Sequence, residues 1–469
     1  MTFGASSSLP RSRICETFVL GETSGFTSGK KLPTYFASMN RHLTRRQFIG
    51  NAALAAAGAW VAGCASPAPR KLSANEKLNI AVIGTANRAR SNIAGVESEN
   101  IVALCDIDDS FLAAIKERHP GARTYNDFRK MLEQRDIDAV VISSADHTHA
   151  VATAAALRLG KHVYCEKPLT HTVFEARTIS RLAARHKKLA TQMGTQIHAG
   201  ENYRRVVEWV QSGVIGQVRE CHVWCEKSLP SSERPTAMPL VPPHIHWDLW
   251  LGPAPTRPYH TEYHPKTWRH WWDFGEGILG DMACHYMDLA FWALQLRHPK
   301  TIEASGPPVH PETTPEWLSV RYEFGARRDL PPVQLTWYDG GKQPALIAEG
   351  RVPDWRNGVL FVGDKGMLIA DYSRRRLLPE AQFADFVPPI PSIPASIGHH
   401  QEWIQACKTG APTSCHFGYG AALTETVLLG NVAYRTGHKL EWNAAQLKVS
   451  NSQTAMNYIQ TEYRKGWTL

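Results

Sequence analysis

The sequence of 469 residues contains few cysteines and no apolar run long enough to cross a membrane. Nine cysteines in a chain of this length do not make a disulfide framework. Cys105, Cys165, Cys221 and Cys225 lie in segments typical of core strands, where we expect buried free thiols. The uncharged, Ala-rich run 51–63 is too short for a membrane-spanning helix, which needs about 20 residues.

An excess of one charge sign is also missing from most of the chain. The formal net charge is +9, yet residues 1–77 hold ten Lys and Arg against three Glu. Residues 78–469 therefore carry a net charge of only +2. A nucleic-acid-binding domain needs a basic patch, so we expect no nucleic-acid partner. The length and the 43% of hydrophobic residues are sufficient for two domains with their own cores.

The basic N-terminal region contains a candidate export signal. Residues 44–50 read Thr-Arg-Arg-Gln-Phe-Ile-Gly and precede the run 51–63, which fits the apolar part of a signal peptide. This order is typical of a twin-arginine signal, which directs folded proteins out of the cytoplasm. We interpret 39–64 as this signal and expect an exported, periplasmic protein. Met39 begins a conventional basic start, so we interpret residues 1–38 as a miscalled extension.

The end of the signal leaves two interpretations open. Val61-Ala62-Gly63-Cys64 matches a lipoprotein cleavage box, in which the cysteine becomes the lipidated first residue. Cys64 is therefore a candidate lipid anchor, whereas ordinary cleavage near Ala65 would leave none. Residues 65–76 are interpreted as a short polar linker.

From residue 77 onward, short apolar strands alternate with helices. This alternation predicts a doubly wound parallel α/β sheet, a Rossmann domain, over residues 77–197. Its predicted strands are 78–83, 101–105, 139–143 and 162–165, and its helices end near 96 or span 109–118, 126–133, 149–158 and 173–186. Residues 198–469 have shorter strands divided by Gly and Pro turns, which predicts an α+β domain with a large, mostly antiparallel sheet. Its clearest strands are 217–226, 319–324, 333–338 and 359–362, and helices 399–408 and 421–436 close it.

The turn after the first predicted strand has the position of a dinucleotide-binding turn. Gly84 ends the strand, and the helix that follows offers free N–H groups and a positive dipole end to a pyrophosphate. Ala86 and Ala89 replace two of the three usual glycines, so this motif alone is weak. The candidate cofactor-binding residues here are Gly84, Thr85, Ala86, Asn87 and Arg88. An unrelated strand–turn–helix is the alternative.

Asp106 supports the cofactor interpretation of this turn. It follows Gly84 by 22 residues and ends the second predicted strand, where a carboxylate can bind the adenosine ribose. A carboxylate repels a 2′-phosphate, and no Arg follows it, so NAD is favoured over NADP as the cofactor.

Two further motifs carry candidate catalytic groups. Glu166-Lys167-Pro168 follows a predicted strand, which places Glu166 and Lys167 at the carboxyl edge of the sheet, where open α/β sheets bind ligands. Residues 281–288 contain Asp281 and His285, which share one face of a helix one turn apart. A carboxylate at that distance can orient an imidazole and raise its basicity. Taken alone, each motif is equally well explained by solvated charges or by a helix with satisfied polar residues.

Together these motifs resemble those of the Gfo/Idh/MocA oxidoreductase family. The helix motif matches the family's Asp-x-Gly-x-His-x-x-Asp, with Ala283 in place of the glycine. The resemblance covers nearly all of residues 77–469. It implies that Lys167 lies beside the nicotinamide and the reacting hydroxyl, that His285 is the general acid or base, and that Asp281 contacts the substrate or His285. Family members commonly pair through the second domain, so the resemblance implies a homodimer or homotetramer.

The loop Asp146-His147-Thr148-His149 also follows a predicted strand. By resemblance it flanks the nicotinamide, and His149 corresponds to the family's usual histidine there. Glu166 belongs to the same expected cofactor site. Helix capping by Asp146 or Thr148 is an equally good account of this loop.

A tryptophan-rich region follows in the second half of the chain. Its rings are Trp247, Trp250, Trp268, Trp271 and Trp272. Aromatic faces suit the C–H faces of sugars, and Arg269, His270 or Tyr263 could bond hydroxyls, but core packing is the expectation for most of these rings. His244 with His246, and His399 with His400, match no zinc spacing, so we expect no metal site.

The resemblance therefore implies an exported NAD-dependent oxidoreductase that acts on a sugar or polyol hydroxyl. A soluble nicotinamide would be scarce outside the cytoplasm, so we expect a tightly bound cofactor that is regenerated in place. Two alternatives stay open. One is an NAD-dependent glycosidase that uses transient oxidation, elimination and re-reduction. The other is a non-catalytic sugar-binding lipoprotein.

Overall fold

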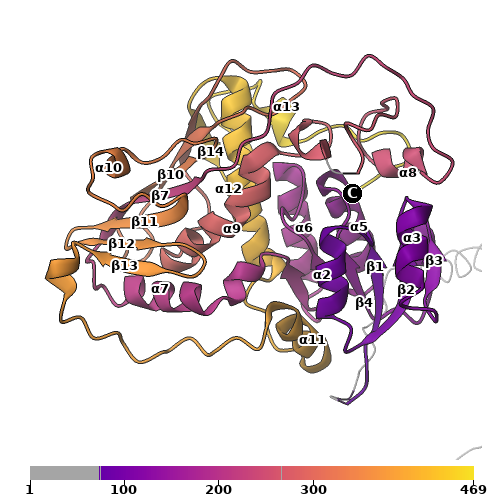
Figure 1. Ribbon diagram of the computed structural model, residues 1–469, viewed down its shortest axis with the longest axis horizontal. Helices are drawn as coiled ribbons and strands as arrows, with labels where there is room; N and C mark the ends of the chain where they lie inside the picture. The colour runs from indigo at the N-terminus through magenta and orange to yellow at the C-terminus, as the bar shows by residue number, and fades with distance from the viewer. Residues whose placement is uncertain (1–72, 74, 266) are drawn as a thin grey trace, which may run out of the picture. The chain divides into compact units, whose positions relative to one another are not determined.

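The computed structural model describes residues 73, 75–265 and 267–469, all within the unit Ser66–Leu469. The predicted signal, the linker up to residue 72 and Cys64 lie outside the described residues. Two sheets dominate the fold (Figure 1). Among the described residues, no helix is both long and apolar enough to span a bilayer.

The first sheet is parallel and has six strands in the order β3-β2-β1-β4-β5-β6. The strands are β1 (Asn79–Ile83), β2 (Asn100–Cys105), β3 (Arg123–Tyr125), β4 (Ala139–Ile142), β5 (His162–Cys165) and β6 (Thr191–Met193). The helices are α2 (Arg88–Gly95), α3 (Asp109–Lys116), α4 (Phe128–Met131), α5 (Asp146–Arg158) and α6 (Val173–Arg185). The predicted Rossmann fold is confirmed. The sequence pattern missed β3 and β6 because three residues are too few to show a period.

The second sheet has nine strands in the order β13-β12-β11-β7-β10-β9-β8-β14-β15. Only the β7–β10 pair is parallel among these neighbours, which confirms the prediction of a mostly antiparallel sheet. The strands are β7 (Val218–Cys225), β8 (Thr301–Ser305), β9 (Ser319–Phe324), β10 (Val333–Tyr338), β11 (Asn357–Gly363), β12 (Met367–Ala370), β13 (Arg375–Leu378), β14 (Leu440–Asn443) and β15 (Lys448–Val449).

Helices lie between and beside the two sheets. They are α7 (Glu201–Gln211), α8 (Trp247–Leu251), α9 (Gly277–Ala293), α10 (Ala345–Ala348), α11 (His399–Thr409), α12 (Phe417–Thr436) and α13 (Met456–Ile459), with short 3-10 turns at Gln196–Ala199, Thr267–His270 and Glu380–Phe383. In Figure 1, α6, α9 and α12 occupy the middle of the fold. One continuous apolar core runs through both halves. A buried ion pair of 2.8 Å between Arg177 of α6 and Glu425 of α12 reinforces this junction.

Helix α11 comes from the second half of the chain but packs against the first sheet. Its Trp403, Ile404 and Cys407 share a buried cluster with strand residues such as Ile80 and Val82. The pattern of helix 399–408 predicts the helix itself but not its destination, because the apolar stripe of a helix does not specify which apolar surface it covers.

The seven cysteines among the described residues are free and buried. This confirms the prediction of buried thiols for Cys105, Cys165, Cys221 and Cys225.

Candidate active site

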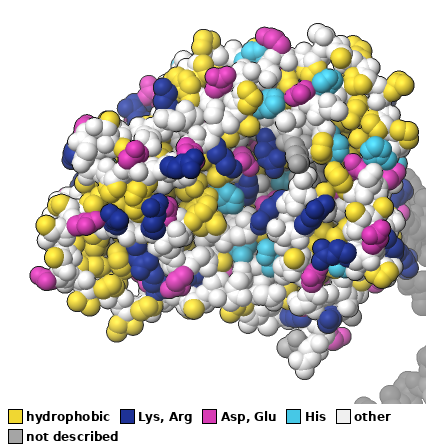
Figure 2. Space-filling model, viewed as in Figure 1, with side chains coloured by type: hydrophobic (Ala, Val, Ile, Leu, Met, Phe, Trp, Pro, Cys, Tyr) yellow, Lys and Arg dark blue, Asp and Glu magenta, His cyan; other side chains and the backbone are white. Residues whose placement is uncertain are grey.

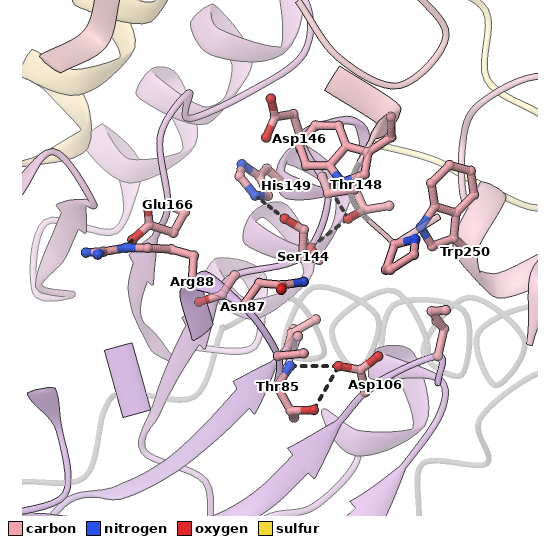
Figure 3. Close-up of a pocket in the computed structure, with 18 of the residues that line it drawn as sticks. Thr85, Asn87, Arg88, Asp106, Ser144, Asp146, Thr148, His149, Glu166 and Trp250 are labelled. Atoms are coloured by element: carbon pink, nitrogen blue, oxygen red, sulfur yellow. Dashed lines mark hydrogen bonds and ion pairs between the residues drawn. The ribbon is translucent and has the colours of Figure 1, made fainter. Parts of the chain in front are cut away.

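A cavity of about 620 Å³ opens at the carboxyl ends of the parallel strands. Its walls come from the β1–α2 turn, the ends of β2, β4 and β5, the start of α9 and the Trp-rich region. All the predicted site residues line it: Gly84, Thr85, Ala86, Asn87, Arg88, Asp106, His149, Glu166, Lys167, Asp281 and His285. Figure 3 shows several of them pointing toward the cavity from different elements. Its volume falls in the range of pockets for small molecules and cofactors.

The turn at Gly84 has a backbone geometry that only glycine fits, and the start of α2 that follows it is open to the cavity. Gly84 has φ +82°, and a Cβ there would lie 2.6 Å from the Ser143 carbonyl oxygen. Asn87 precedes α2 without a capping hydrogen bond from its side chain, so the first N–H groups of the helix are not capped by it. Asn87 and Arg88 are exposed at the cavity. These features fit a pyrophosphate at the helix start.

Asp106, directly after β2, is hydrogen-bonded to this turn. One carboxylate oxygen accepts hydrogen bonds from the N–H and the hydroxyl of Thr85, at 2.7 and 2.8 Å (Figure 3). The other accepts from the N–H of Asp108 at 3.1 Å. Burial raises the pKa of Asp106, although these hydrogen bonds oppose the shift. The oxygen that accepts from Asp108 keeps a second lone pair, so Asp106 can hold the turn and still accept a bond from a ribose hydroxyl.

Glu166 ties the helix α2 to the end of β5. Its Oε1 accepts hydrogen bonds from Arg88 Nε at 3.2 Å, Asn92 Nδ2 at 2.9 Å and Gln196 Nε2 at 2.8 Å. The residue is buried, so this carboxylate is a fixed negative charge that positions Arg88 at the start of α2. Gln196 was not predicted, since nothing in its local sequence marks it as a partner of Glu166.

Lys167 contacts Asp281 across the junction of the two halves. Its Nζ donates to the Asp281 carbonyl oxygen at 2.6 Å and to the carboxylate at 2.8 Å. Burial disfavours the ammonium, but Asp281 outweighs it and raises the pKa of Lys167. Burial equally opposes ionisation of Asp281, and the charges of Lys167, Arg269 and Lys227 outweigh it and lower its pKa. Both partners are therefore ionised.

Of the two expected contacts of Asp281, with the substrate or with His285, the described residues show no hydrogen bond to His285. The Asp281 carboxylate is taken up by Lys167, because an ammonium attracts it more strongly than a neutral imidazole does. The Nδ1 of His285 instead lies 3.4 Å from the Thr195 hydroxyl. Burial and the neighbouring Lys167 lower the pKa of His285 well below its ordinary value, so the ring is neutral at neutral pH.

Asp288, the last residue of the helix motif, is bound by side chains from outside its own helix. Its carboxylate is fully buried, lies 2.9 Å from Nδ1 of His198 and accepts from the Tyr419 hydroxyl at 2.7 Å. Both partners come from distant segments. Asp288 therefore has a structural role, because it connects α9 to the segments that carry His198 and Tyr419.

His149 is held by two backbone carbonyls. Its Nδ1 lies 2.8 Å from the Pro168 oxygen and its Nε2 lies 3.0 Å from the Ser144 oxygen (Figure 3). Only a doubly protonated ring donates to both. Burial would lower the pKa of His149, but Cys165, Asp146 and the Pro168 carbonyl raise it to about 10.

The capping interpretation of this loop is wrong. Helix α5 begins at Asp146 after Ala145 and has no side-chain cap. The Thr148 hydroxyl donates to the Ala145 carbonyl oxygen at 2.8 Å, so it serves as a donor rather than as a cap. Asp146 is buried, and burial raises its pKa. Its neighbour Glu276 is also buried, and burial together with Asp146 raises the pKa of Glu276 well above its usual range.

The tryptophans are mostly core residues, as predicted. All five are at most 9% exposed, and Trp247 stacks on Trp250 with ring centroids 4.5 Å apart. Trp250 and Trp268 also line the cavity, where Arg269 joins them. Tyr263 is held by Arg234, and His270 is buried.

The histidine pairs considered as metal ligands have other partners. His246 lies near Asp109, His399 near the Met193 carbonyl and His400 near the Asn92 amide. Within the described ranges, no group of three or more His, Cys, Asp or Glu could hold a metal ion.

Lys227 is a further lining residue that the sequence pattern did not single out. It follows β7 in a loop, and an isolated exposed lysine gives no signal in a single sequence. Its contact with Asp281, at 3.7 Å, depends on the packing of β7 beside α9.

Comparisons with known proteins agree with this geometry. Residues 78–194 match the model of an oxidoreductase family with an NAD-binding Rossmann fold, and residues 222–469 match that family's C-terminal alpha/beta domain. The chain is 29% identical to the inositol 2-dehydrogenase of Salmonella typhimurium over 148 residues, which is 31% of this chain and 43% of the relative. It is 34% identical to inositol 2-dehydrogenase 3 of Saccharopolyspora erythraea over 150 residues, 31% of this chain and 44% of the relative. The matches thus span less than half of these relatives.

Similar solved structures cover more of the fold. The WlbA dehydrogenase of Chromobacterium violaceum, in complex with NADH and UDP-GlcNAcA, has a TM-score of 0.58 and 16% identity. It covers 81% of this chain and 99% of its own. The aldose-aldose oxidoreductase of Caulobacter crescentus, complexed with glycerol, has a TM-score of 0.56 and 16% identity, over 78% of this chain and 100% of its own. The two matched domains together span most of the chain, which therefore belongs to the Gfo/Idh/MocA oxidoreductase family, with its NAD-binding Rossmann domain.

Proposed function

We propose that the protein is an exported NAD-dependent oxidoreductase that oxidises a hydroxyl of a sugar or polyol. The observation that carries this proposal is that Lys167, Asp281 and His285 line the same cavity as the Gly84 turn. The curated relatives are named inositol 2-dehydrogenases, and one similar structure is an aldose-aldose oxidoreductase. Polyols and sugars are therefore the substrate class that we propose.

The residues around the turn suit NAD in named positions. The start of α2 and Arg88 would hold the pyrophosphate, and Asp106 would accept from the adenosine ribose. Asp106 disfavours a 2′-phosphate, so NAD is proposed rather than NADP. Bound NAD supplies the hydride acceptor.

Proton transfer falls to the chain's own residues. The charged Lys167, held by Asp281, donates a hydrogen bond to the substrate oxygen and stabilises negative charge as it develops there. The neutral His285 accepts the hydroxyl proton. Since Asp281 already binds Lys167, we assign to Asp281 the role of orienting that ammonium.

Turnover of the purified full-length chain tests this proposal. A panel of sugars and polyols is mixed with NAD, and NADH formation is followed by absorbance. We expect at least one substrate to be oxidised, and Lys167→Met to lower kcat about 100- to 10,000-fold. Lys130→Met, on an exposed surface outside the cavity, is the matched control and leaves the rate unchanged. Protein that neither contains nor binds a nicotinamide contradicts the proposal and supports a non-catalytic sugar-binding lipoprotein.

A reaction in heavy water separates oxidation from the glycosidase alternative. Glycosides are incubated with the protein, and the products are examined by mass spectrometry. An accumulated keto-sugar supports the dehydrogenase. Released aglycone with deuterium at the carbon beside the oxidised one, and no net NADH, supports transient oxidation followed by re-reduction.

Export rests on the twin-arginine motif, which lies outside the described residues. Replacing both Arg45 and Arg46 by Lys keeps the charge but removes the motif. We expect this variant to remain in the cytoplasm of a cell whose wild-type protein fractionates with the periplasm or membrane. Unchanged fractionation contradicts export by this route. A Cys64→Ser variant that loses membrane association supports lipidation, and one that keeps it contradicts the anchor.

A further inference from the structure

Three cations surround a single carboxylate at one end of the cavity. Asp281 lies 2.8 Å from Lys167 Nζ, 3.3 Å from Arg269 Nε and 3.7 Å from Lys227 Nζ. With Lys167, Lys227 and Arg269 charged, one ionised Asp281 leaves this group with a net charge of +2.

The other acids that line the cavity do not neutralise this excess. Asp106 is bound to Thr85 at the turn, and Glu166 is paired with Arg88. Asp127 pairs with Arg129 near the same end as Asp106. Asp146 is buried beside His149, which is itself a cation.

Of these three cations, Lys227 and Arg269 have room for a ligand. Their side chains are 54% and 37% exposed, whereas that of Lys167 is only 12% exposed and makes two contacts with Asp281. Figure 2 shows Lys and Arg side chains gathered around the hollow in the middle of this face.

Neighbouring side chains hold both cations in place. The Arg269 guanidinium lies over the Trp268 ring at 4.2 Å, and Lys227 Nζ lies 3.2 Å from the Met282 sulfur. A guanidinium fixed in this way presents a planar fork that matches a carboxylate, phosphate or sulfate.

A substrate that binds over Arg269 and Lys227 would remove water from these two cations. A neutral sugar would remove water from two cations and return no opposite charge, which costs free energy. An anionic group would replace that water with a charge-assisted hydrogen bond. The pyrophosphate is not the anion in question, because its expected place is at Arg88 and the α2 turn.

Resting on the function proposed above, we infer that the substrate is an anionic sugar whose carboxylate, phosphate or sulfate is bound by Arg269 and Lys227. Trp268 and Trp250 are the aromatic walls beside this site. The hydroxyl to be oxidised then lies at Lys167, and the anionic group lies at Arg269 and Lys227, which contact the same carboxylate of Asp281.

Binding to the full-length chain saturated with NADH tests this inference without turnover. Isothermal titration compares hexuronates, hexose phosphates and hexose sulfates with the matching neutral hexoses of gluco, galacto and manno configuration. We expect at least one anionic sugar to bind about tenfold or more tightly than its neutral counterpart. Raising the salt from about 50 to about 500 mM should weaken that binding but not the binding of the neutral sugar. The chemical class that binds best identifies the anionic group.

Charge-removing variants locate the site. Arg269→Gln and Lys227→Gln should each weaken the binding of the anionic sugar about tenfold more than they weaken the binding of the neutral hexose. Arg321→Gln is the matched control, since Arg321 is similarly exposed and pairs with Glu303 away from the cavity. Anionic sugars that bind no better than neutral ones overturn the inference, as do variants that weaken both kinds of sugar alike. If neutral sugars are oxidised with no anionic preference, the proposed oxidoreductase survives and only this inference fails. If neither NADH nor any sugar binds, both fail.

Discussion

His285 shows how burial decides the chemistry of a single residue. The ring stands near the middle of the long buried helix α9, and burial and Lys167 both disfavour its cationic form. A base that must accept a proton at neutral pH is useful only when it is neutral. The same environment makes His285 a weak base, so in the proposed mechanism the ammonium of Lys167 beside the substrate hydroxyl assists the loss of its proton.

We predict that this environment sets the acid limit of the activity. Because the pKa of His285 lies well below 6.5, kcat/KM should fall only at pH values below about 6.5, where the ring begins to take up a proton. The measurement is a pH profile of the wild type and of His285→Asn. The variant should be at least about 100-fold slower and should lack this acid limb. An acid limb centred above 6.5 contradicts the assignment of His285 as the base.

Asp146 and Glu276 form a buried pair whose protonation affects the stability of the fold. Both are carboxyl groups, and burial raises both pKa values. His149, His171 and Glu175 also face this pair, with His171 Nε2 3.8 Å from Glu276. Both carboxylate oxygens of Glu276 lack a hydrogen-bond donor among the described residues. Protonation of Glu276 therefore removes the free-energy cost of burying its charge.

The predicted consequence is a stability that depends on pH through Glu276. A carboxyl group whose pKa is raised in the folded state stabilises the fold fully below its unfolded pKa of about 4.5, and this stability is lost as the pH rises toward the folded pKa. Glu276→Gln cannot ionise, and its amide can donate to Asp146. The variant should match the wild type near pH 4.5 and exceed its free energy of unfolding by on the order of 2 kcal/mol near pH 8. Urea denaturation at both pH values checks this, and a variant that is less stable at both contradicts it.

At the scale of elements, the turn between β1 and α2 carries the cofactor end of the cavity. Its requirement for glycine is geometric, since Gly84 combines a positive φ with close approach to Ser143. Ala86, in the same turn, is partly exposed at the cavity. The sequence therefore has a weak glycine fingerprint, but the turn keeps glycine at position 84, where its backbone geometry requires it.

Gly84→Ala is expected to damage both stability and cofactor binding. The added Cβ would lie 2.6 Å from the Ser143 oxygen at a φ of +82°, so the turn must shift. We expect a loss of about 1–3 kcal/mol in the free energy of unfolding and at least about tenfold weaker NADH binding. Gly121→Ala is the control, because a Cβ there meets nothing within 4 Å. Thermal melts and titration with NADH distinguish the two variants, and equal behaviour would contradict the role of the turn.

At the scale of the whole molecule, the two halves of the chain are not independent. Helix α11 covers the first sheet, and His400 lies 3.0 Å from the Asn92 amide of α2, the helix that begins at the cofactor turn. Lys408 also pairs with the buried Glu99 at 2.8 Å. Residues of the second half therefore contact the first sheet and α2, and other residues of the same half line the cavity.

Trp403→Ala tests this dependence. The ring is fully buried against the first sheet, so its loss should cost about 3–5 kcal/mol of the free energy of unfolding. We also expect weaker NADH binding, because α11 positions α2. Gln405→Ala changes an exposed residue of the same helix and should change neither quantity. Denaturation curves with NADH titrations are the measurement, and a destabilised variant that binds NADH normally would limit α11 to a stabilising role.

Much of the fold and of the candidate site follows from local sequence rules. The buried parallel strands are short continuous apolar runs that alternate with helices, so the parallel sheet and its ligand-binding edge are visible along the chain. Gly84, Asp106 and Lys167 stand at strand ends, and Asp281 and His285 stand one helical turn apart, so their neighbourhoods were predictable. Their chemical roles stay predictions until the experiments above are done.

Tertiary structure alone decided which of these groups touch. Asp281 binds Lys167, 114 residues away, rather than the His285 that shares its helix face. The cations at Arg269 and Lys227, the buried partner of Asp146 and the destination of α11 are likewise contacts between distant segments. The physical reason is that burial and charge act through space. A single sequence records which side chains are present along the chain, but the energy of each depends on which others folding brings within a few ångströms.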